Sequence, residues 1–267
     1  MTNQDKSPSD DNQDEPNTEV SSSSDSAAIS FEHVLEVLQK GDISNQHGLV
    51  QWSSNYTFLM SVKHEDIELM CVYKPQRGER PLWDFPDGTL CCRERAAFLT
   101  SDILGWQLVP PTVLRDGPQG FGSVQFFIDH DPNYHYFEFD KSLAPQLGQL
   151  ALFDVLINNA DRKGGHCVVD SQQHMWGIDH GIAFHVNNKL RTVIWDFAGQ
   201  PIPEIMLESV QRLATKLETP DDDFRQELDK LLNEREVKAF IWRVNHVLEN
   251  KHYPERGPGH NYPWPPV

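Results

Sequence analysis

The residues best suited to chemistry lie in one segment, NNADRKGGHCVVDSQQHMWGIDHG, which contains Asp161, His166 and Asp179. His166 follows Asp161 by five positions, and Asp179 comes directly before His180-Gly181. In phosphoryl transfer, one Asp positions or deprotonates the acceptor, a polar residue five positions on binds a metal ion, and a second Asp holds Mg²⁺. A hairpin between His166 and Asp179 would bring both ends of the segment to one cleft. The alternative is structural, because DR followed by GG is a common turn and an Asp at a strand end is often a cap.

A second pair of candidates lies upstream. Lys74 ends the apolar run in CVYKP, and Glu94 lies in CCRERAAFL, within the next expected helix. A strand lysine paired with a helix glutamate is how kinases hold the α- and β-phosphates of ATP. Taken alone, Lys74 also fits a surface lysine, and Glu94 fits an acid favoured by the helix dipole. The order Lys, Glu, Asp, His and Asp-x-Gly favours a phosphoryl-transfer site.

The elements that position these residues differ between the two halves of the chain. The first half predicts a helix at FEHVLEVLQK, ending near Gly41, followed by an antiparallel meander with a KHED turn. A Pro- and Gly-rich loop then leads to a second helix, which stops at Gly105. The expected strands are 48–52, 56–62, 67–73 and two more within 106–117 and 122–131, and the second helix is 90–104.

The second half is predicted to be mostly helical. We expect a helix over 147–157, short strands at CVVD and MWGID, and three helices over 204–217, 221–233 and 234–249. A β-rich part followed by a helical part predicts an α+β fold of two lobes, with the seam near 129–133. The expected boundaries are a disordered acidic tail (1–28), a nucleotide-binding N-lobe with one helix (29–130), a catalytic C-lobe (131–250) and an extended Pro-rich tail (251–267).

Composition limits the classes of protein. The 267 residues include 23 Lys and Arg against 40 Asp and Glu, a net charge of −17, and 38% are hydrophobic, enough for a sizeable core. The acidic balance weighs against nonspecific nucleic-acid binding and docking on anionic membranes. No apolar run reaches the roughly 18 residues of a membrane span, and no signal peptide is evident, so we expect a cytoplasmic protein without integral membrane association. The four cysteines form no CxxC pair, which leaves a zinc ribbon unsupported.

Several segments together resemble bacterial proteins related to the phosphatidylinositol 3-/4-kinase superfamily, over about residues 34–250. They are VYKPQRGERPLWDFPDGTL, RERAAFLTSDILGWQLVPPTVLRDGPQGFGSVQ, NNADRKGGH, GIDHG and KLRTVIWDFAG. HipA-type Ser/Thr kinases share this wider kinase-like architecture. The resemblance implies a two-lobed kinase-like fold that binds ATP with Mg²⁺ or Mn²⁺. It matches Lys74 and Glu94 to the phosphate-binding pair, Phe126, Phe127 and Ile128 to the hinge at adenine, Asp161 to the catalytic Asp, and Asp179 to the metal-binding Asp.

The sequence departs from that family at three places. His166 stands where the family usually has Asn, and a neutral imidazole prefers softer or transition ions to Mg²⁺. The Asp-x-Gly motif reads DHG, and the nucleotide loop WSSNYTF has no glycine. Ser53, Ser54 and Asn55 offer phosphate donors there, although a Ser/Asn turn between strands is the commoner meaning.

These observations predict an ATP- and metal-dependent phosphotransferase, with Asp161 as catalytic residue and Asp179 and His166 as metal ligands. The sequence leaves the acceptor unresolved, although the negative charge favours a protein side chain or a soluble small molecule over a bulk lipid. Two alternatives stay open. One is a non-catalytic nucleotide-binding scaffold, favoured by His166 and the glycine-free loop, and the other is transfer of AMP to a protein.

Overall fold

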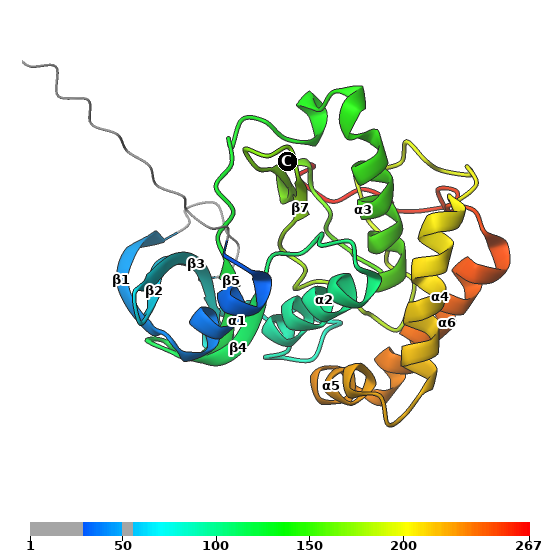
Figure 1. Ribbon diagram of the computed structural model, residues 1–267. Coiled ribbons are helices and arrows are strands. Elements are labelled where there is room, and N and C mark those ends of the chain that lie inside the picture. The colour runs from blue at the N-terminus through cyan, green and yellow to red at the C-terminus, as the bar shows by residue number, and fades with distance from the viewer. Residues whose placement is uncertain (1–28, 50–55) are drawn as a thin grey trace, which may run out of the picture.

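A computed structural model describes residues 29–49 and 56–267, and side chains are described except at 45–49. Residues 1–28 and the positions Ser53, Ser54 and Asn55 therefore lie outside the described residues. Figure 1 shows a curled sheet on one side of the molecule and a group of helices on the other, with α2 between them. This arrangement confirms the expected two-lobed α+β fold.

The curled sheet is antiparallel, and its strands run in the order β1-β2-β3-β5-β4. The meander of β1, β2 and β3 is as expected, but the first strand begins earlier than the expected 48–52. The strand expected within 106–117 is shorter than predicted. It begins only at Thr112, because Pro110 and Pro111 have no N–H to donate to the sheet. The strands are β1 (Asp42–Leu49), β2 (Phe58–His64), β3 (Ile67–Pro75), β4 (Thr112–Gly117) and β5 (Gly120–Phe126).

Two helices flank the sheet, and both lie where the sequence predicted them, at FEHVLEVLQK and 90–104. Helix α1 (Phe31–Lys40) packs on the sheet, and its Val34, Val37 and Leu38 share a buried cluster with Cys71 and Tyr73 of β3. Helix α2 (Leu90–Leu104) ends at Gly105, which has a left-handed φ of 71°. The buried apolar residues of α2 belong to the core of the helical half, because the helix packs against α4 and α5.

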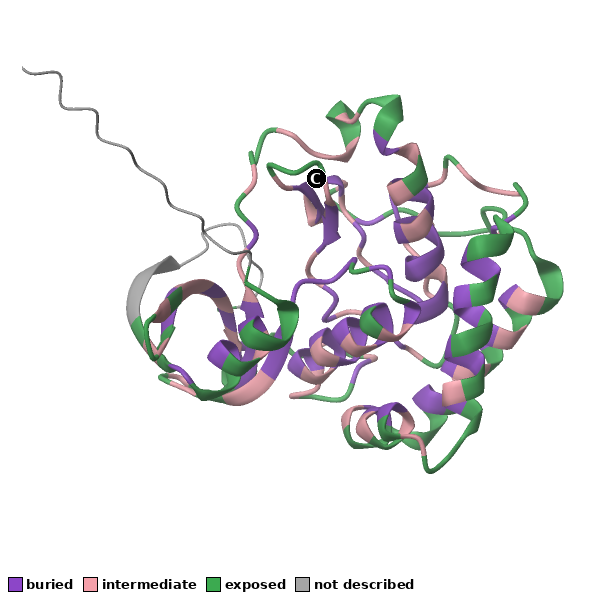
Figure 2. Ribbon diagram, viewed as in Figure 1, coloured by how far each residue is buried: buried purple, intermediate pink, exposed green. Residues whose placement is uncertain are grey.

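The helical half is built around α3 (Ala144–Ile157), most of whose residues are buried (Figure 2). A small hairpin, β6 (Cys167–Val169) and β7 (Met175–Gly177), follows α3. Three amphipathic helices then cover the core, with buried residues on one side and exposed residues on the other (Figure 2). They are α4 (Glu204–Glu218), α5 (Asp223–Leu231) and α6 (Glu234–Asn250). In the part of the chain that the structure describes, no helix has the length and apolarity of a membrane span.

The chain after α6 returns across the helical half and ends beside β7 (Figure 1). Tyr253 is buried and donates its hydroxyl to the carbonyl oxygen of Gly148 in α3. Asn261 accepts hydrogen bonds through its carbonyl oxygen from the backbone N–H of Thr192 and from Nε1 of Trp195. The final turn brings the carbonyl oxygen of Pro266 to 2.7 Å from the backbone nitrogen of Gly164. The C-terminal segment is thus fixed against the loop that follows α3.

Candidate active site

Lys74 faces away from the α1 side of the sheet because side chains alternate along a strand. Its neighbours Tyr73 and Pro75 are buried on the opposite face of β3. The Nζ atom of Lys74 lies 2.6 Å from Oε1 of Glu94 and 2.8 Å from Oδ1 of Asp179. Burial alone would lower the pKa of Lys74, but the two carboxylates outweigh burial and raise it. Lys74 is therefore a fixed positive charge that joins the sheet, α2 and the DHG segment.

Glu94 is the link between these three elements. Its side chain is 3% exposed, with one oxygen on Lys74 and the other accepting the backbone N–H of His180 at 2.9 Å. Helix α2 is held in register by Arg93, whose Nη1 donates to the carbonyl oxygen of Ala183 and whose Nη2 lies 2.5 Å from Glu236 in α6. At the helix start, Glu79 accepts the backbone N–H groups of residues 90 and 91. The contacts of Arg93 and Glu79 thus fix helix α2, and with it the position of Glu94.

The loop of residues 159–166, here the Asp161 loop, begins where α3 stops. Asn158 takes a left-handed φ of 54°, which ends the helix, and the side chain of Asn159 accepts the backbone N–H of Asp161. The carboxylate of Asp161 lies 3.4 Å from Nζ of Lys163. Burial, with a smaller contribution from nearby Asp179, raises the pKa of Asp161 to about 6 despite the opposing charge of Lys163. A carboxylate with this pKa is suited to accept a proton near neutral pH.

A buried ion pair supports the loop from beneath. Arg162 and Asp154 are both fully buried and contact one another through Nη2 and Oδ1 at 3.0 Å. Arg162 also donates Nη1 to the carbonyl oxygens of His166 and Ile178. Its Nη2 lies 2.6 Å from Nε2 of His180, so that nitrogen is an acceptor and His180 is neutral; burial also lowers the His180 pKa. Arg162 therefore connects α3, the Asp161 loop and the DHG segment through one side chain.

His166 lies between Asp161 and Asp179. Its Nδ1 atom is 3.0 Å from the carbonyl oxygen of Asp161, and its Nε2 atom is 3.3 Å from Oδ2 of Asp179. Because a carbonyl oxygen only accepts, Nδ1 must carry a proton. Burial lowers the pKa of His166 to about 4, so the ring is neutral at pH 7 and Nε2 presents a lone pair. Asp179, with φ of 60°, is itself held in an uncommon backbone conformation and has a pKa lowered, against the effect of burial, mainly by Lys74.

Two acceptors that face each other at 3.3 Å suit a cation that both can bind. Ligands about 2.1 Å from one ion and adjacent in its coordination sphere lie about 3 Å apart, so this donor pair fits a divalent metal. Among the residues described, no group of three His, Cys, Asp or Glu side chains has metal-binding geometry, so this pair would supply two ligands only.

The structure brings together five of the expected site residues: Lys74, Glu94, Asp161, His166 and Asp179. The cavity at these residues has a volume of only about 30 Å³ and includes Tyr56 and Glu79 in its lining. The expected hinge lies between the lobes. The backbone N–H of Phe127 donates to the carbonyl oxygen of Met70, and Ile128 packs with Val168 and Trp176.

Sequence reasoning missed three residues of this site, namely Asp154, Arg162 and Lys163. Lys163 could have been found because it lies two residues after Asp161. Asp154 could have been found because it is a charged residue among the apolar residues of α3, and its ion-pair partner is Arg162. Two nearby basic side chains are engaged elsewhere. Arg77 contacts the side chain of Gln119, and Lys189 forms an ion pair with Asp84.

No protein-family model matches the chain. Protein Rv2133c of Mycobacterium tuberculosis is 41% identical over 257 residues, which covers 82% of this chain and 90% of that protein.

Among solved structures, the fold is similar to the Golgi casein kinase with Mn/ADP bound, with a TM-score of 0.54, 14% identity and coverage of 89% of this chain and 80% of that one. Hydra Fam20 with sugar gives a TM-score of 0.52 at 14% identity, covering 84% of this chain and 90% of that one. The Helicobacter pylori proinflammatory kinase CtkA gives 0.50 at 13% identity, covering 80% and 94%. At these identities the likeness shows a kinase-like fold.

Proposed function

Because the chain belongs to the family of protein Rv2133c and has a kinase-like fold, we propose that it is an ATP- and divalent-metal-dependent phosphotransferase. The observation that carries this proposal is the ion-pair chain from Glu94 through Lys74 to Asp179, with His166 beside it. A structural ion pair would need only two of these residues. A phosphate-binding site needs a cation held by one acid and a second acid free to bind metal.

In the proposed reaction, the acceptor hydroxyl oxygen attacks the γ-phosphorus of ATP as the bond to the bridging oxygen breaks and ADP leaves. Asp161 orients the hydroxyl and takes its proton, for which its raised pKa is suited. Lys163, 3.4 Å from Asp161, offers positive charge to the transferred group. Lys74 binds the α- and β-phosphates, and Glu94 holds it in place.

Asp179 and His166 are the proposed metal ligands. A bound divalent ion would neutralise charge on the β- and γ-phosphates. Lys74 and the metal would compete for Asp179 until ATP arrives, because Oδ1 already contacts Lys74 and only Oδ2 faces His166.

Nucleotide binding also requires room for the base. The apolar group of Ile128, Val168 and Trp176, with Ile178 packed against it, offers a surface for adenine next to the cleft. The cavity of about 30 Å³ at Lys74 is smaller than a triphosphate, so we propose that the two sides separate on binding. The part assigned to Ser53, Ser54 and Asn55 stays a prediction.

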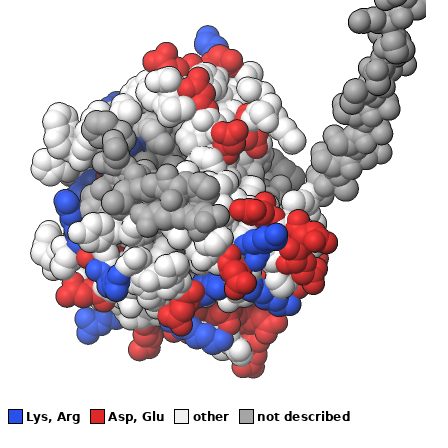
Figure 3. Space-filling view, turned by 90° about the vertical axis from the view of Figure 1, so that its left-hand side faces the viewer, with Lys and Arg blue, Asp and Glu red and all other residues white. Residues whose placement is uncertain are grey.

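We propose a hydroxyl of a protein or of a soluble small molecule as the acceptor. The family resemblance includes lipid kinases, yet the net charge of −17 opposes approach to an anionic bilayer. On the face in Figure 3, basic side chains lie among acidic ones, so that face offers no broad basic field to lipid headgroups.

One experiment separates the proposal from its alternatives. The protein is first heated with ATP and either Mg²⁺ or Mn²⁺, and a rise in melting temperature is expected. ATP labelled at the γ-phosphate is then compared with ATP labelled at the α-phosphate, using Asp161→Asn and Asp179→Asn as controls. Transfer of the γ-label that both variants abolish supports a kinase. Transfer of the α-label supports AMP transfer, and nucleotide binding without either label supports a scaffold.

A further inference from the structure

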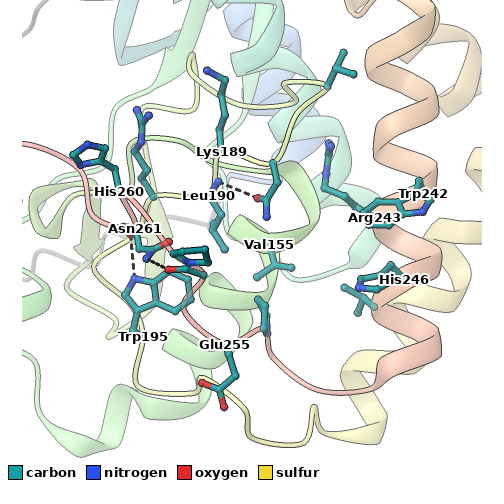
Figure 4. Close-up of a pocket in the computed structure, with 17 residues that line it drawn as sticks. Val155, Lys189, Leu190, Trp195, Trp242, Arg243, His246, Glu255, His260 and Asn261 are labelled. Carbon is teal, nitrogen blue, oxygen red and sulfur yellow. Dashed lines mark hydrogen bonds between the residues drawn. The ribbon is translucent and has the colours of Figure 1, made fainter.

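A cavity of about 570 Å³ lies behind the Asp161 loop, well within the size range of small-molecule sites. It is bounded by the segment 186–195, by α6 and by the C-terminal segment 254–261, with Val155 of α3 at its base (Figure 4). The proposed phosphotransfer reaction uses none of the side chains that line it.

The charge of this cavity is opposite to that of the protein. Arg191 lines it, and its guanidinium has no hydrogen bond or ion pair with any residue that the structure describes. The acid in the lining, Glu255, forms no ion pair within the described part of the chain, and it points away from the other labelled side chains in Figure 4. His246 and His260 add further polar groups to the lining.

Arg243 is a second, more buried cation in the same wall. It extends inward from α6 (Figure 4), is 8% exposed, and donates Nε to the carbonyl oxygen of Leu156 and Nη1 to that of His185. Its Nη2 is buried and has no hydrogen-bond partner among the described residues. Burial lowers the pKa of Arg243 to about 10, and Glu236 offsets this only in part, since that carboxylate already pairs with Arg93. The charge of Arg243 therefore lacks a counterion of its own.

Aromatic and aliphatic side chains provide the rest of the surface. Trp242 is 62% exposed and stacks on His246 with 4.8 Å between ring centroids. Trp195 is held by its Nε1 hydrogen bond to the carbonyl oxygen of Asn261, so that wall is already formed. A cavity that combines an exposed indole with Arg191, which has no side-chain partner among the described residues, and with Arg243, which lacks a counterion, suits a ligand with an apolar body and a negative group.

We propose that this cavity binds a small organic anion, a carboxylate or a phosphate ester carried on an aromatic or aliphatic body. Arg191 contacts the anionic group, Arg243 adds its uncompensated charge, and Trp242 packs on the body. The ligand also reaches the Asp161 loop indirectly, because the backbone N–H of Arg191 donates to Asn159 and its carbonyl oxygen accepts from Arg162.

The test measures binding of 1-naphthyl phosphate, 1-naphthoate and inorganic phosphate by calorimetry, with tryptophan fluorescence as a second signal. Arg191→Ala should weaken binding of the preferred naphthyl anion about tenfold, as expected for a lost charge-assisted hydrogen bond. Arg191→Glu should weaken it further. Trp242→Ala should weaken the naphthyl compounds but leave inorganic phosphate unchanged. The naphthyl compound that binds more tightly shows whether the site prefers a phosphate or a carboxylate group. Either preference supports the proposal.

Arg235→Ala is the matched control, since Arg235 is an exposed arginine at the other end of α6. It should bind like the wild type, and all variants should keep the wild-type melting temperature. Three results would overturn the proposal: no binding of either naphthyl anion at about 1 mM, equal binding by the wild type and both Arg191 variants, or loss of binding only in a Lys74→Met variant of the ATP cleft. The test does not depend on phosphotransfer, so its failure would leave the proposed function standing.

Discussion

The Nε2 atom of His166 lies 3.3 Å from Oδ2 of Asp179, while its Nδ1 atom is already committed to the carbonyl oxygen of Asp161. The neutral imidazole and the carboxylate therefore direct lone pairs at the same point. Under the proposed function, His166 replaces the Asn that is usual in the family the sequence resembles and exchanges a hard oxygen donor for a softer nitrogen.

The choice of metal should follow from that nitrogen. We expect Mn²⁺ to support turnover at least as well as Mg²⁺ in the wild type. His166→Asn should keep activity and shift the preference toward Mg²⁺, whereas His166→Ala should lose at least about tenfold at limiting metal. Initial rates of the three proteins with each ion test this. Equal Mn²⁺/Mg²⁺ ratios across the set would show that His166 only packs in its turn.

Replacing Lys74 should lower kcat/KM for ATP more than replacing its ion-pair partner Glu94. Lys74→Met leaves Glu94 and Asp179 as unpaired negative charges that repel ATP, so we expect turnover to fall by about 10²- to 10³-fold. Glu94→Gln should lower turnover less, because Lys74 still forms its ion pair with Asp179. The measurement is kcat/KM for ATP, and Lys63→Met, at an exposed strand lysine, is the matched control. Activity of Lys74→Met within about threefold of the wild type would contradict the assigned role.

Much of this site could be predicted from the sequence, because its residues are tied to strongly patterned elements. Helix α2 has the predicted bounds, since a Pro- and Gly-rich loop precedes it and Gly105 stops it. The order of Lys74, Glu94, Asp161 and Asp179 along the chain was enough to predict that they meet. Strand β1 was placed too late because its sequence, DISNQHGL, is polar and lacks a regular apolar alternation.

The supporting residues were harder to find. The bond from Gly164 to Pro266 joins positions about a hundred residues apart, and a Pro-rich end carries no signal for its docking site. The role of Arg162 depends on four contacts from three segments, which no local pattern reveals. Sequence thus predicts which candidate side chains meet better than it predicts which residues hold them in place.

The buried pair of Asp154 and Arg162 gives a prediction about stability. Asp154→Ala leaves a fully buried guanidinium without its counter-charge, so we expect a loss of about 3–5 kcal/mol, seen as a fall in melting temperature of about 10 °C. The double variant Asp154→Leu, Arg162→Met should recover most of that stability but not activity, because Met cannot donate to the carbonyl oxygens of His166 and Ile178. Full activity in the double variant would show that the pair does not position the loop.

Asp161 should lower the stability of the metal-free protein above pH 6. Its pKa is about 6 in the folded chain and near 3.8 when exposed, so the folded state holds the proton more tightly than the unfolded state. The folded protein therefore loses stability, relative to a variant that cannot ionise, as the pH rises from about 4 to about 6. Asp161→Asn removes this cost. At pH 7.5 in chelator, it should be more stable by about 3 kcal/mol, or about 8 °C, and the gain should shrink toward zero near pH 4. Thermal unfolding of both proteins at several pH values measures the difference, with Asp66→Asn at an exposed turn as control. A gain that is the same at every pH would instead point to relief of a contact unrelated to the charge of Asp161.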